Sequence, residues 1–458
     1  MKINTFTLLI IILFIAAGCT SKSDFPQEAE TQILDCVALD IQKLSRKEKN
    51  TSKVWKALDQ HHKNAESRNL IIFQDGTGNT HKTNTNIWQM YNFAVNNSCS
   101  QPDVPYYRRG LGTSVGNLLL GKLTGSGIDH SIREGYKFLV ETYQPGDKIF
   151  LFGFSRGAYI ARSLNGMLEY VGLLNKDRLV GKSAEERGEI VDDLYAFYNH
   201  LNDGEPRFSE RLYSIIADKI KVKYGDLPLY THENKVVATA IGVFDTVPAL
   251  GIGRDDFPDN HRTELCATEG YHALAIDEQR NDFRPLRFND QVKPEQHLDE
   301  VWFAGAHADV GGGYDSKGLE SIARQWMLKK FAKFNLFPGE KRSCNTYDAV
   351  CEGGELHDEF LVQPLFKTFG LHWRKPACSD TVHASVLCRL NIEALPKPNQ
   401  EKEPQGRYQP ENIYPCLKSS YNFVPKNYRC SNGQDPLAMI EQKATCSGPC
   451  RISKNECN

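Results

Sequence analysis

The chain has 458 residues, and its 55 lysines and arginines nearly balance its 57 aspartates and glutamates, which leaves a formal net charge of −2. A nearly neutral chain exerts no long-range attraction on a polyanion, so the composition argues against nucleic-acid binding. At about 100 to 200 residues per domain, the length predicts one large domain with an appendage, or two domains.

Residues 1–18 have the pattern of an export signal. Lys2 precedes an apolar run from Phe6 to Ala17 that is too short to span a bilayer, and small residues then lead to Cys19. This ending resembles a bacterial lipobox, in which Cys19 would become the acylated first residue of the mature chain; a signal cleaved in the ordinary way, or not cleaved, is the alternative. The residue after Cys19 is Thr20 and not the aspartate that, in such lipoproteins, resembles an inner-membrane retention signal, which favours the outer membrane. We therefore expect an exported protein, lipid-anchored to the bacterial cell envelope at the outer membrane.

Twelve of the 13 cysteines remain once Cys19 is set aside, an even number that can pair fully in an oxidising compartment. Nine of them lie at or beyond Cys344, so at least one of these nine must pair outside that region or remain a thiol. The cysteines available to it are Cys36, Cys99 and Cys266. No paired CxxC motif with a downstream histidine pair is present, so the spacing favours disulfides over zinc.

Four short apolar runs predict the strands of a buried sheet. They are residues 70–73, 148–152, 236–244 and 301–306. Continuous apolar runs of this length are typical of parallel strands covered on both faces. Apolar residues at helical spacing between Ala158 and Leu174 place a helix between two of the runs. We therefore predict an α/β protein with a mostly parallel sheet and helices on both faces.

Changes in composition predict the domain boundaries. Residues 19–66 are polar and are assigned to a tether with at most one helix, residues 67–340 to the sheet domain, and residues 341–458 to a disulfide-stapled C-terminal region.

A polar stretch at about 175–234 interrupts the strand pattern and predicts a helical insertion over the carboxyl edge of the sheet. Its apolar face contains Val191, Leu194, Tyr195 and Tyr198 at helical spacing. Two interpretations stay open: this face packs in the core, or it forms a lid that opens onto lipid.

The strongest motif is a G-x-S-x-G sequence from Gly153 to Gly157, which lies between an apolar strand and an amphipathic helix. In this context the central residue of a sharp strand-to-helix turn is a nucleophile, and the helix N-terminus behind it favours negative charge on a reacting oxygen. The alternative is a tight turn with an incidental serine. We predict that Ser155 is a nucleophile.

A serine nucleophile needs a general base that is oriented by a carboxylate. Asp245 ends one apolar strand after Ser155, and His307 ends the next, which is the Ser–acid–His order of α/β hydrolases. The alternatives are a capping role for Asp245 and a loop-shaping hydrogen bond for His307. Asp309 is the competing carboxylate, interpreted as a loop brace for the glycine run that follows it. The competing bases, His272 and His297, are disfavoured because neither directly follows a strand.

An oxyanion hole requires two backbone N–H donors. One is available at Arg156, directly after the nucleophile. The second must come from an earlier strand-end loop, and the glycine-rich turn that begins at Asp75 predicts Gly76 or Thr77 in that role. The alternative is a structural turn in which the Asp75 carboxylate braces the backbone.

Two other hydrolase classes are disfavoured. Aspartyl phosphatases of the haloacid dehalogenase type carry D-x-D-G-T, but Phe73 occupies the nucleophilic position here. A metal hydrolase built from Asp75, Asp245, His307 and Asp309 lacks an HExxH motif or a clustered histidine pair. No metal or cofactor is therefore expected.

Four sequence blocks resemble those of a large, mostly uncharacterised α/β-hydrolase domain family that includes the type VI secretion phospholipase effectors. The blocks are residues 70–79, 153–162, 243–247 and 307–314, and the likeness spans about residues 68–335. Residues 271–278 are similar to a further block, which we interpret as a buried helix. The resemblance implies a hydrolase of lipid carboxylic esters with Ser155, Asp245 and His307 as its triad. A lipid-anchored binding or envelope protein on a non-catalytic hydrolase scaffold is the alternative.

Overall fold

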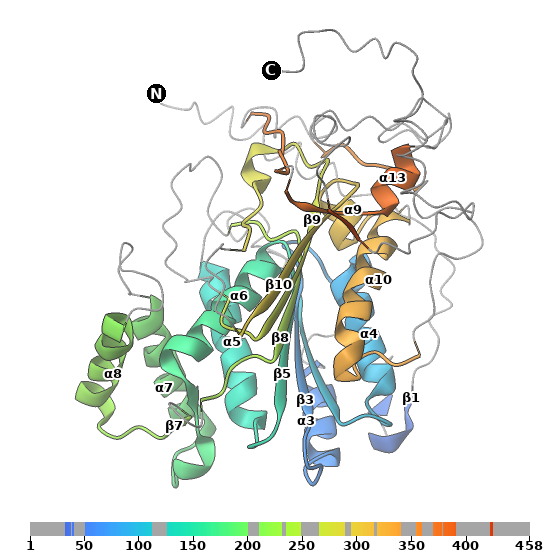
Figure 1. Cartoon of the computed structure of the whole chain (residues 1–458). Coiled ribbons are helices and arrows are strands. Elements are labelled where there is room, and N and C mark those ends of the chain that lie inside the picture. Colours follow the sequence, from blue (N-terminus) through green and yellow to red (C-terminus); the bar gives the residue numbers. More distant parts are fainter. Residues whose placement is uncertain are drawn as a thin grey trace, which may run out of the picture.

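The computed structural model of the chain is shown in Figure 1. It describes residues 33–37, 39–40, 51–111, 126–199, 210–230, 235–248, 265–288, 295–315, 318–339, 354–359, 370–377, 379–390 and 422–424. The predicted signal at 1–18 and the predicted acylation site Cys19 lie outside the described residues.

An eight-stranded sheet forms the centre of the molecule, with the order β12-β11-β10-β9-β8-β5-β3-β4. The strands are β3 (Asn69–Gln74), β4 (Asp103–Arg108), β5 (Lys148–Phe154), β8 (Ala240–Phe244), β9 (Glu269–Ala275), β10 (His297–Phe303), β11 (Thr381–His383) and β12 (Asn422–Val424). Every neighbouring pair is parallel, so all carboxyl ends meet at one edge. The predicted α/β-hydrolase fold class is confirmed.

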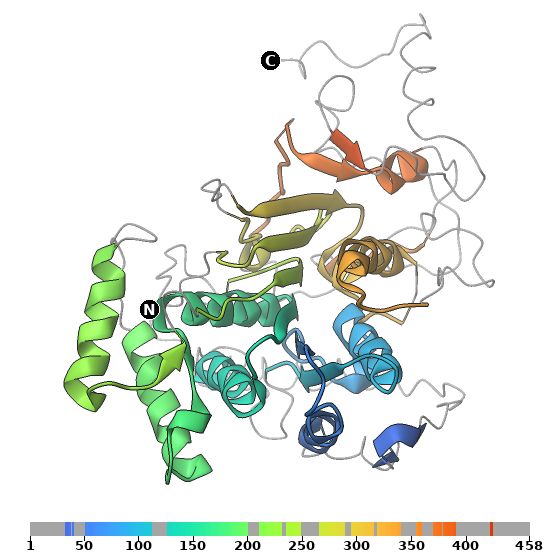
Figure 2. The same ribbon diagram turned by 60° about the horizontal axis from the view of Figure 1, so that its bottom comes forward.

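Helices cover both faces of this sheet (Figures 1 and 2). Helices α5 (Ser126–Thr142) and α6 (Arg156–Val171) pack on one face, and α4 (Asn86–Asn97) and α10 (Leu319–Phe331) on the other. Helix α3 (Thr51–His61) packs against β4 and contributes Trp55 to one apolar core and Leu58 to the other. Burial of apolar residues on both sides explains why the central strands are continuous apolar runs.

The N-terminal segment that the sequence assigns to a tether contributes to this domain. Besides α3, it supplies Cys36, which forms a disulfide with Cys99 at the end of α4. Arg68 binds Asp59 of α3 and Asp147, which precedes β5, at 2.7 and 2.6 Å. This part of the chain is therefore packed against the β4 side of the sheet.

The C-terminal region also joins the sheet. Strand β11 pairs with β10, β12 pairs with β11, and a short helix, α13 (Ser385–Leu390), follows β11. Cys388 in this helix is disulfide-bonded. The central sheet thus continues across the boundary predicted at residue 340. Because Cys36 and Cys99 pair with each other and the buried Cys266 carries a thiol, none of these three is the disulfide partner of the odd C-terminal cysteine.

The insertion contains α7 (Ala184–Asn199) and α8 (Glu210–Tyr224), which pack outside α5 and α6, as the green helices of Figure 2 show. Leu194 and Tyr198 are fully buried in the core, and the Tyr198 hydroxyl donates to the Ser163 carbonyl at 2.9 Å. The lid interpretation is therefore wrong. The apolar face of α7 packs against the neighbouring helices α5 and α6.

The interpretation of residues 271–278 as a buried helix is also wrong. Residues Glu269–Ala275 form β9, between β8 and β10. Alanines at 273 and 275 favour a helix locally, but pairing with strands on both sides overrides that preference. As a result, Asp277 and Glu278 lie just beyond the end of a strand, at the carboxyl edge of the sheet.

Candidate active site

The turn between β5 and α6 has the geometry expected of a nucleophile elbow. Ser155 has φ of 59° and ψ of −127°, a conformation that residues other than glycine rarely adopt. A Cβ added at Gly153 would lie 2.5 Å from the Ala158 Cα, and one added at Gly157 would lie 2.2 Å from the Gln74 carbonyl oxygen. Strand and helix can therefore approach this closely only with glycine on both sides of the serine.

Asp245 follows β8, the strand next to β5. Its backbone N–H donates to the Ala273 carbonyl at 2.7 Å, and its carboxylate accepts from the Ala275 N–H at 3.0 Å. The Ser155 N–H in turn donates to the Phe244 carbonyl at 3.0 Å. The backbone of the predicted nucleophile is thus hydrogen-bonded to the last residue of β8, which directly precedes the predicted acid.

His307 begins α9 (His307–Gly311), and its Nδ1 lies 2.5 Å from Asp245 Oδ2. An ionised carboxylate is acceptor only, so Nδ1 carries the proton and Nε2 carries the lone pair. Nε2 is buried and has no hydrogen-bond partner among the described residues, so it is not hydrogen-bonded to Ser155. The imidazole therefore has a free acceptor, as a general base requires before substrate binds.

Electrostatics keep the two partners in the forms that this geometry needs. Burial lowers the pKa of His307, while the neighbouring Asp245 opposes that shift. Burial by itself would raise the pKa of Asp245, but Arg374 and His307 hold it below its usual range. At neutral pH the pair is accordingly an ionised carboxylate and a neutral imidazole.

Arg374 is a member of the site that sequence reasoning missed. Its Nη1 and Nη2 donate to Asp245 Oδ1 and Oδ2 at 2.6 and 2.9 Å, and the pair is almost fully buried. The residue lies in the Cys-rich region 129 positions from Asp245. No strand pattern or motif surrounds it, so the sequence contains no local signal for this contact.

Glu278 was also missed, because its block was interpreted as a helix. Its carboxylate accepts from the His307 N–H at 3.2 Å and from Arg280 Nε and Nη2 at 2.8 and 2.7 Å. The charge of Arg280 lowers the pKa of Glu278 to about 2 although burial opposes it. An acidic residue just past an apolar run was the available signal, the same one that singled out Asp245.

The structure narrows the choice of oxyanion-hole donors. Gly76 lies against the nucleophile, since a Cβ added to it would be 3.2 Å from the Ser155 Cβ. However, the Gly76 N–H donates to Asp75 Oδ1 at 2.7 Å and is therefore occupied. The Thr77 hydroxyl is buried and has no hydrogen-bond partner among the described residues. Of the two predicted residues, Thr77 has donor capacity left, alongside the helix N-terminus at Arg156.

The two supporting aspartates both brace loops. Asp75 accepts from the Thr85 and Tyr107 hydroxyls at 2.9 and 2.8 Å, and its burial raises its pKa to about 6. Asp309 accepts from the Ala306 N–H at 2.9 Å and lies 2.7 Å from His357 Nδ1. Asp309 therefore does not compete with Asp245 for His307.

The competing histidines are placed elsewhere. His272 lies within β9, fully buried, where its Nε2 accepts from the Thr246 N–H at 3.1 Å and its Nδ1 lies 2.8 Å from Glu300. His297 is the first residue of β10, at the opposite end of the strand from His307, and pairs with Asp299 at 3.2 Å. Among the described residues, these bonds join neither imidazole to Ser155, Asp245 or His307.

In the described part of the chain, no helix is long and apolar enough to cross a membrane. The same residues contain no group of three or more His, Cys, Asp or Glu side chains arranged to hold a metal ion.

The fold and the strand-end site define an α/β-hydrolase-type protein. Residues 68–330 match the family model described as "T6SS, Phospholipase effector Tle1-like, catalytic domain", and the chain belongs to this family. An uncharacterized yeast protein, YEL023C of Saccharomyces cerevisiae, is 32% identical over 240 residues, which are 48% of this chain and 33% of the yeast protein.

Two solved structures resemble the chain more distantly. An uncharacterized protein from Pseudomonas aeruginosa has a TM-score of 0.34 and 15% identity over 66% of this chain and 50% of its own. The Tle1 effector bound to the VgrG spike of the type 6 secretion system has a TM-score of 0.28 and 19% identity over 55% of this chain and 52% of its own. The chain thus spans about a third of the yeast relative and about half of each solved structure.

Proposed function

We propose that the protein is a serine hydrolase that cleaves carboxylic esters of lipids, phospholipids among them, with Ser155, Asp245 and His307 as its triad. The observation that carries the proposal is the buried Asp245–His307 pair, 2.5 Å apart, beside a serine in a strained elbow conformation. Membership of a family described by its phospholipase effectors supports a lipid ester as substrate.

In the proposed mechanism, Ser155 Oγ attacks the ester carbonyl carbon while His307 Nε2 accepts the hydroxyl proton. The N–H of Arg156 and donors of Thr77 stabilise the resulting oxyanion. Collapse of this intermediate breaks the bond to the alcohol, which takes the proton from His307 and leaves an acylated serine. Water, deprotonated by the same imidazole, then releases the carboxylic acid and restores the hydroxyl of Ser155.

The experiment that tests this mechanism compares wild type with Ser155→Ala. The purified full chain in detergent would be assayed on a soluble short-chain ester and on phosphatidylcholine vesicles, and labelled with a fluorophosphonate probe. We expect Ser155→Ala to lower the rate by about four orders of magnitude or more and to abolish labelling. Full activity in a folded Ser155→Ala protein would refute the mechanism.

Ser100→Ala is the matched control. Ser100 is exposed after α4, and its hydroxyl donates only to the Asn97 carbonyl at 3.0 Å. The control should keep wild-type rates and labelling. If the wild type neither labels nor cleaves any ester, the non-catalytic binding or envelope role becomes the better proposal.

We also propose that the protein is exported and anchored to the outer membrane through an acylated Cys19, because the first 19 residues follow the lipoprotein pattern. Mass spectrometry of the N-terminal peptide from the membrane fraction should find Cys19 acylated as the first residue. Cys19→Ser should release the protein from that fraction. An N-terminal peptide that retains residues 1–18 would contradict the anchor.

A further inference from the structure

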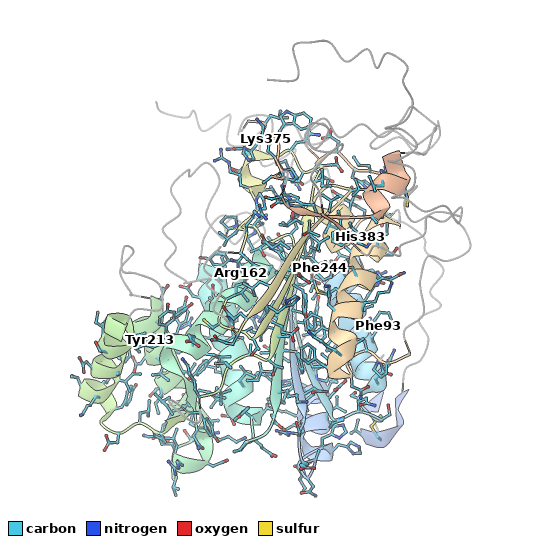
Figure 3. All side chains as sticks on the ribbon, in the orientation of Figure 1. Phe93, Arg162, Tyr213, Phe244, Lys375 and His383 are labelled. Atoms are coloured by element: carbon cyan, nitrogen blue, oxygen red, sulfur yellow. A yellow bond between two sulfur atoms is a disulfide. The ribbon has the colours of Figure 1, made fainter. Side chains whose placement is uncertain are left out.

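The C-terminal region places a buried cation at the centre of the site. Arg374 lies in the segment 370–377, which runs beside the turn that follows β9. In that segment the His372 N–H donates to the Gln279 carbonyl at 2.8 Å. Trp373 and Lys375 are exposed, whereas Arg374 between them is 2% exposed. Figure 3 labels Lys375 near the top, above Phe244, the residue before Asp245. The extended segment therefore directs Arg374 inward, onto the end of β8.

The Arg374 guanidinium is held on the far side as well. Nη1 donates to the Ala275 carbonyl at 2.7 Å, and Nη2 donates to the Phe283 carbonyl at 2.6 Å. Each of these nitrogens thus bridges Asp245 and a backbone carbonyl. A planar guanidinium fixed at four points leaves the carboxylate opposite it one orientation.

All hydrogen-bonding positions of Asp245 are then filled. Oδ1 accepts from Arg374 and from the Ala275 N–H, and Oδ2 accepts from Arg374 and from His307. A carboxylate offers about four lone-pair positions. Rotation of the carboxylate would break several bonds at once, so Oδ2 stays aimed at His307 Nδ1.

Arg374 reaches His307 by a second route. The carbonyl of Phe283 accepts from Arg374, and the ring of Phe283 packs edge-on against the imidazole of His307, 4.9 Å between centroids. The position of this ring therefore depends on the same guanidinium.

The charge of Arg374 has two effects. A carboxylate that is fully buried with only a neutral imidazole beside it tends to take up a proton, and the cation prevents this. The same positive charge opposes protonation of the Asp245–His307 pair as a whole, and so moves the loss of the free base to lower pH.

From this geometry we propose that Arg374 is a positioning residue of the hydrolase site. It fixes the orientation of Asp245, and through it that of His307, which makes the Cys-rich C-terminal region part of the catalytic unit. The inference rests on the proposed function, because it concerns the same triad.

The test compares Arg374→Gln and Arg374→Lys with wild type, in the full chain, on a soluble short-chain ester across pH 4–9. Arg374→Gln removes the positive charge and the pair of N–H donors that binds both carboxylate oxygens of Asp245. We expect kcat to fall about 10- to 100-fold, as for loss of other side chains that orient a reacting group, with KM little changed. The acid limb of the pH profile should move to higher pH, because removing a positive charge raises the pKa of the pair.

Arg374→Lys separates charge from geometry. Lysine keeps the positive charge but cannot donate in a bidentate fork. Its acid limb should therefore stay close to that of wild type while kcat remains lowered. Arg287→Gln is the matched control: Arg287 binds Asp380 of the C-terminal region at 3.0 Å, half-exposed, without touching Asp245. It should keep both kcat and the acid limb.

A folded Arg374→Gln protein with wild-type kcat and an unmoved acid limb would overturn the inference. If that variant fails to fold, Arg374→Lys decides, since wild-type kcat in the lysine variant also overturns it. A lowered kcat that Arg287→Gln reproduces would indicate a general loss of packing and count against a specific role. An inactive wild-type protein would instead refute the proposed function. The two failures are distinguishable, because the first is measured on the wild type and the second on the variants.

Discussion

The phenyl ring of Phe154 lies 4.6 Å from the imidazole of His307, centroid to centroid. Phe154 is the last residue of β5, so the residue before the proposed nucleophile forms one wall of the pocket that holds the proposed base. Gly311, one turn after His307, makes room for this ring: a Cβ added there would lie 2.0 Å from Phe154 Cε2. Gly311 is therefore required for the packing of Phe154 beside the proposed base.

We predict that Gly311→Ala lowers both activity and stability. The added methyl must displace the Phe154 ring, and forcing a group into a packed core costs about 1 to 3 kcal/mol. The displaced ring would release the imidazole, so kcat on a soluble ester should fall more than KM changes. Thermal melting and steady-state kinetics measure the two effects.

Gly188→Ala is the control for the Gly311 prediction. Gly188 also lies in a helix, α7, but a Cβ there would meet only the end of the Lys137 side chain, at 3.8 Å. Alanine is the better helix former, so this variant should melt at the same temperature or higher. Equal melting temperatures for the two alanine variants would show that the packing of the Phe154 ring does not require glycine at position 311.

The pH dependence of activity follows from the burial of His307. Burial lowers its pKa below the ordinary 6.5, and Asp245 reverses only part of that shift. The neutral imidazole therefore predominates at pH 6.5 and above, and it is lost as pH falls through the lowered folded-state pKa. We predict an acid limb of kcat/KM with its midpoint below pH 6.5 on a soluble, non-ionising ester. A midpoint above 6.5 would mean that the carboxylate outweighs burial.

Much of the site could be predicted from strand ends alone. The apolar runs before Asp75, Ser155, Asp245 and His307 became β3, β5, β8 and β10 within a few residues. Since parallel strands bring their carboxyl ends to one edge, finding the strands also found the side chains that meet there.

The sequence could not show which hydrogen-bond donors are already occupied, or which residues distant in the chain contact the site. Gly76 and Thr77 are equivalent in the sequence, but only the structure reveals that the Asp75 carboxylate has taken the Gly76 N–H. Arg374 belongs to a region without periodic pattern, so its contact with Asp245 depends wholly on tertiary packing. The strand β9 was missed because its preference is set by its neighbours on both sides.

Thr77 should be important for stabilising the oxyanion. Its hydroxyl is buried and lacks a partner among the described residues, next to a glycine that touches Ser155. We predict that Thr77→Val, which keeps the shape but removes the donor, lowers kcat by up to about 10²-fold with little change in KM. Thr77→Ser keeps the hydroxyl and should retain most of the activity. Wild-type kcat in the valine variant would show that the hydroxyl does not stabilise the oxyanion, and would leave the backbone N–H as the only oxyanion donor of Thr77.

The last prediction concerns α7, whose apolar face packs in the core. Leu194 is fully buried against α5 and α6, so Leu194→Ala should destabilise the fold by about 2 to 5 kcal/mol. Activity per folded molecule should change by the same factor on a soluble ester and on phospholipid vesicles, because the apolar face of this helix is buried against α5 and α6 and is not available to bind lipid. Val222→Ala on α8 is the control, since Val222 is 89% exposed and its loss should leave the melting temperature unchanged. A Leu194→Ala protein with wild-type stability and a selective loss of vesicle hydrolysis would restore the lid and require α7 to leave the position described here.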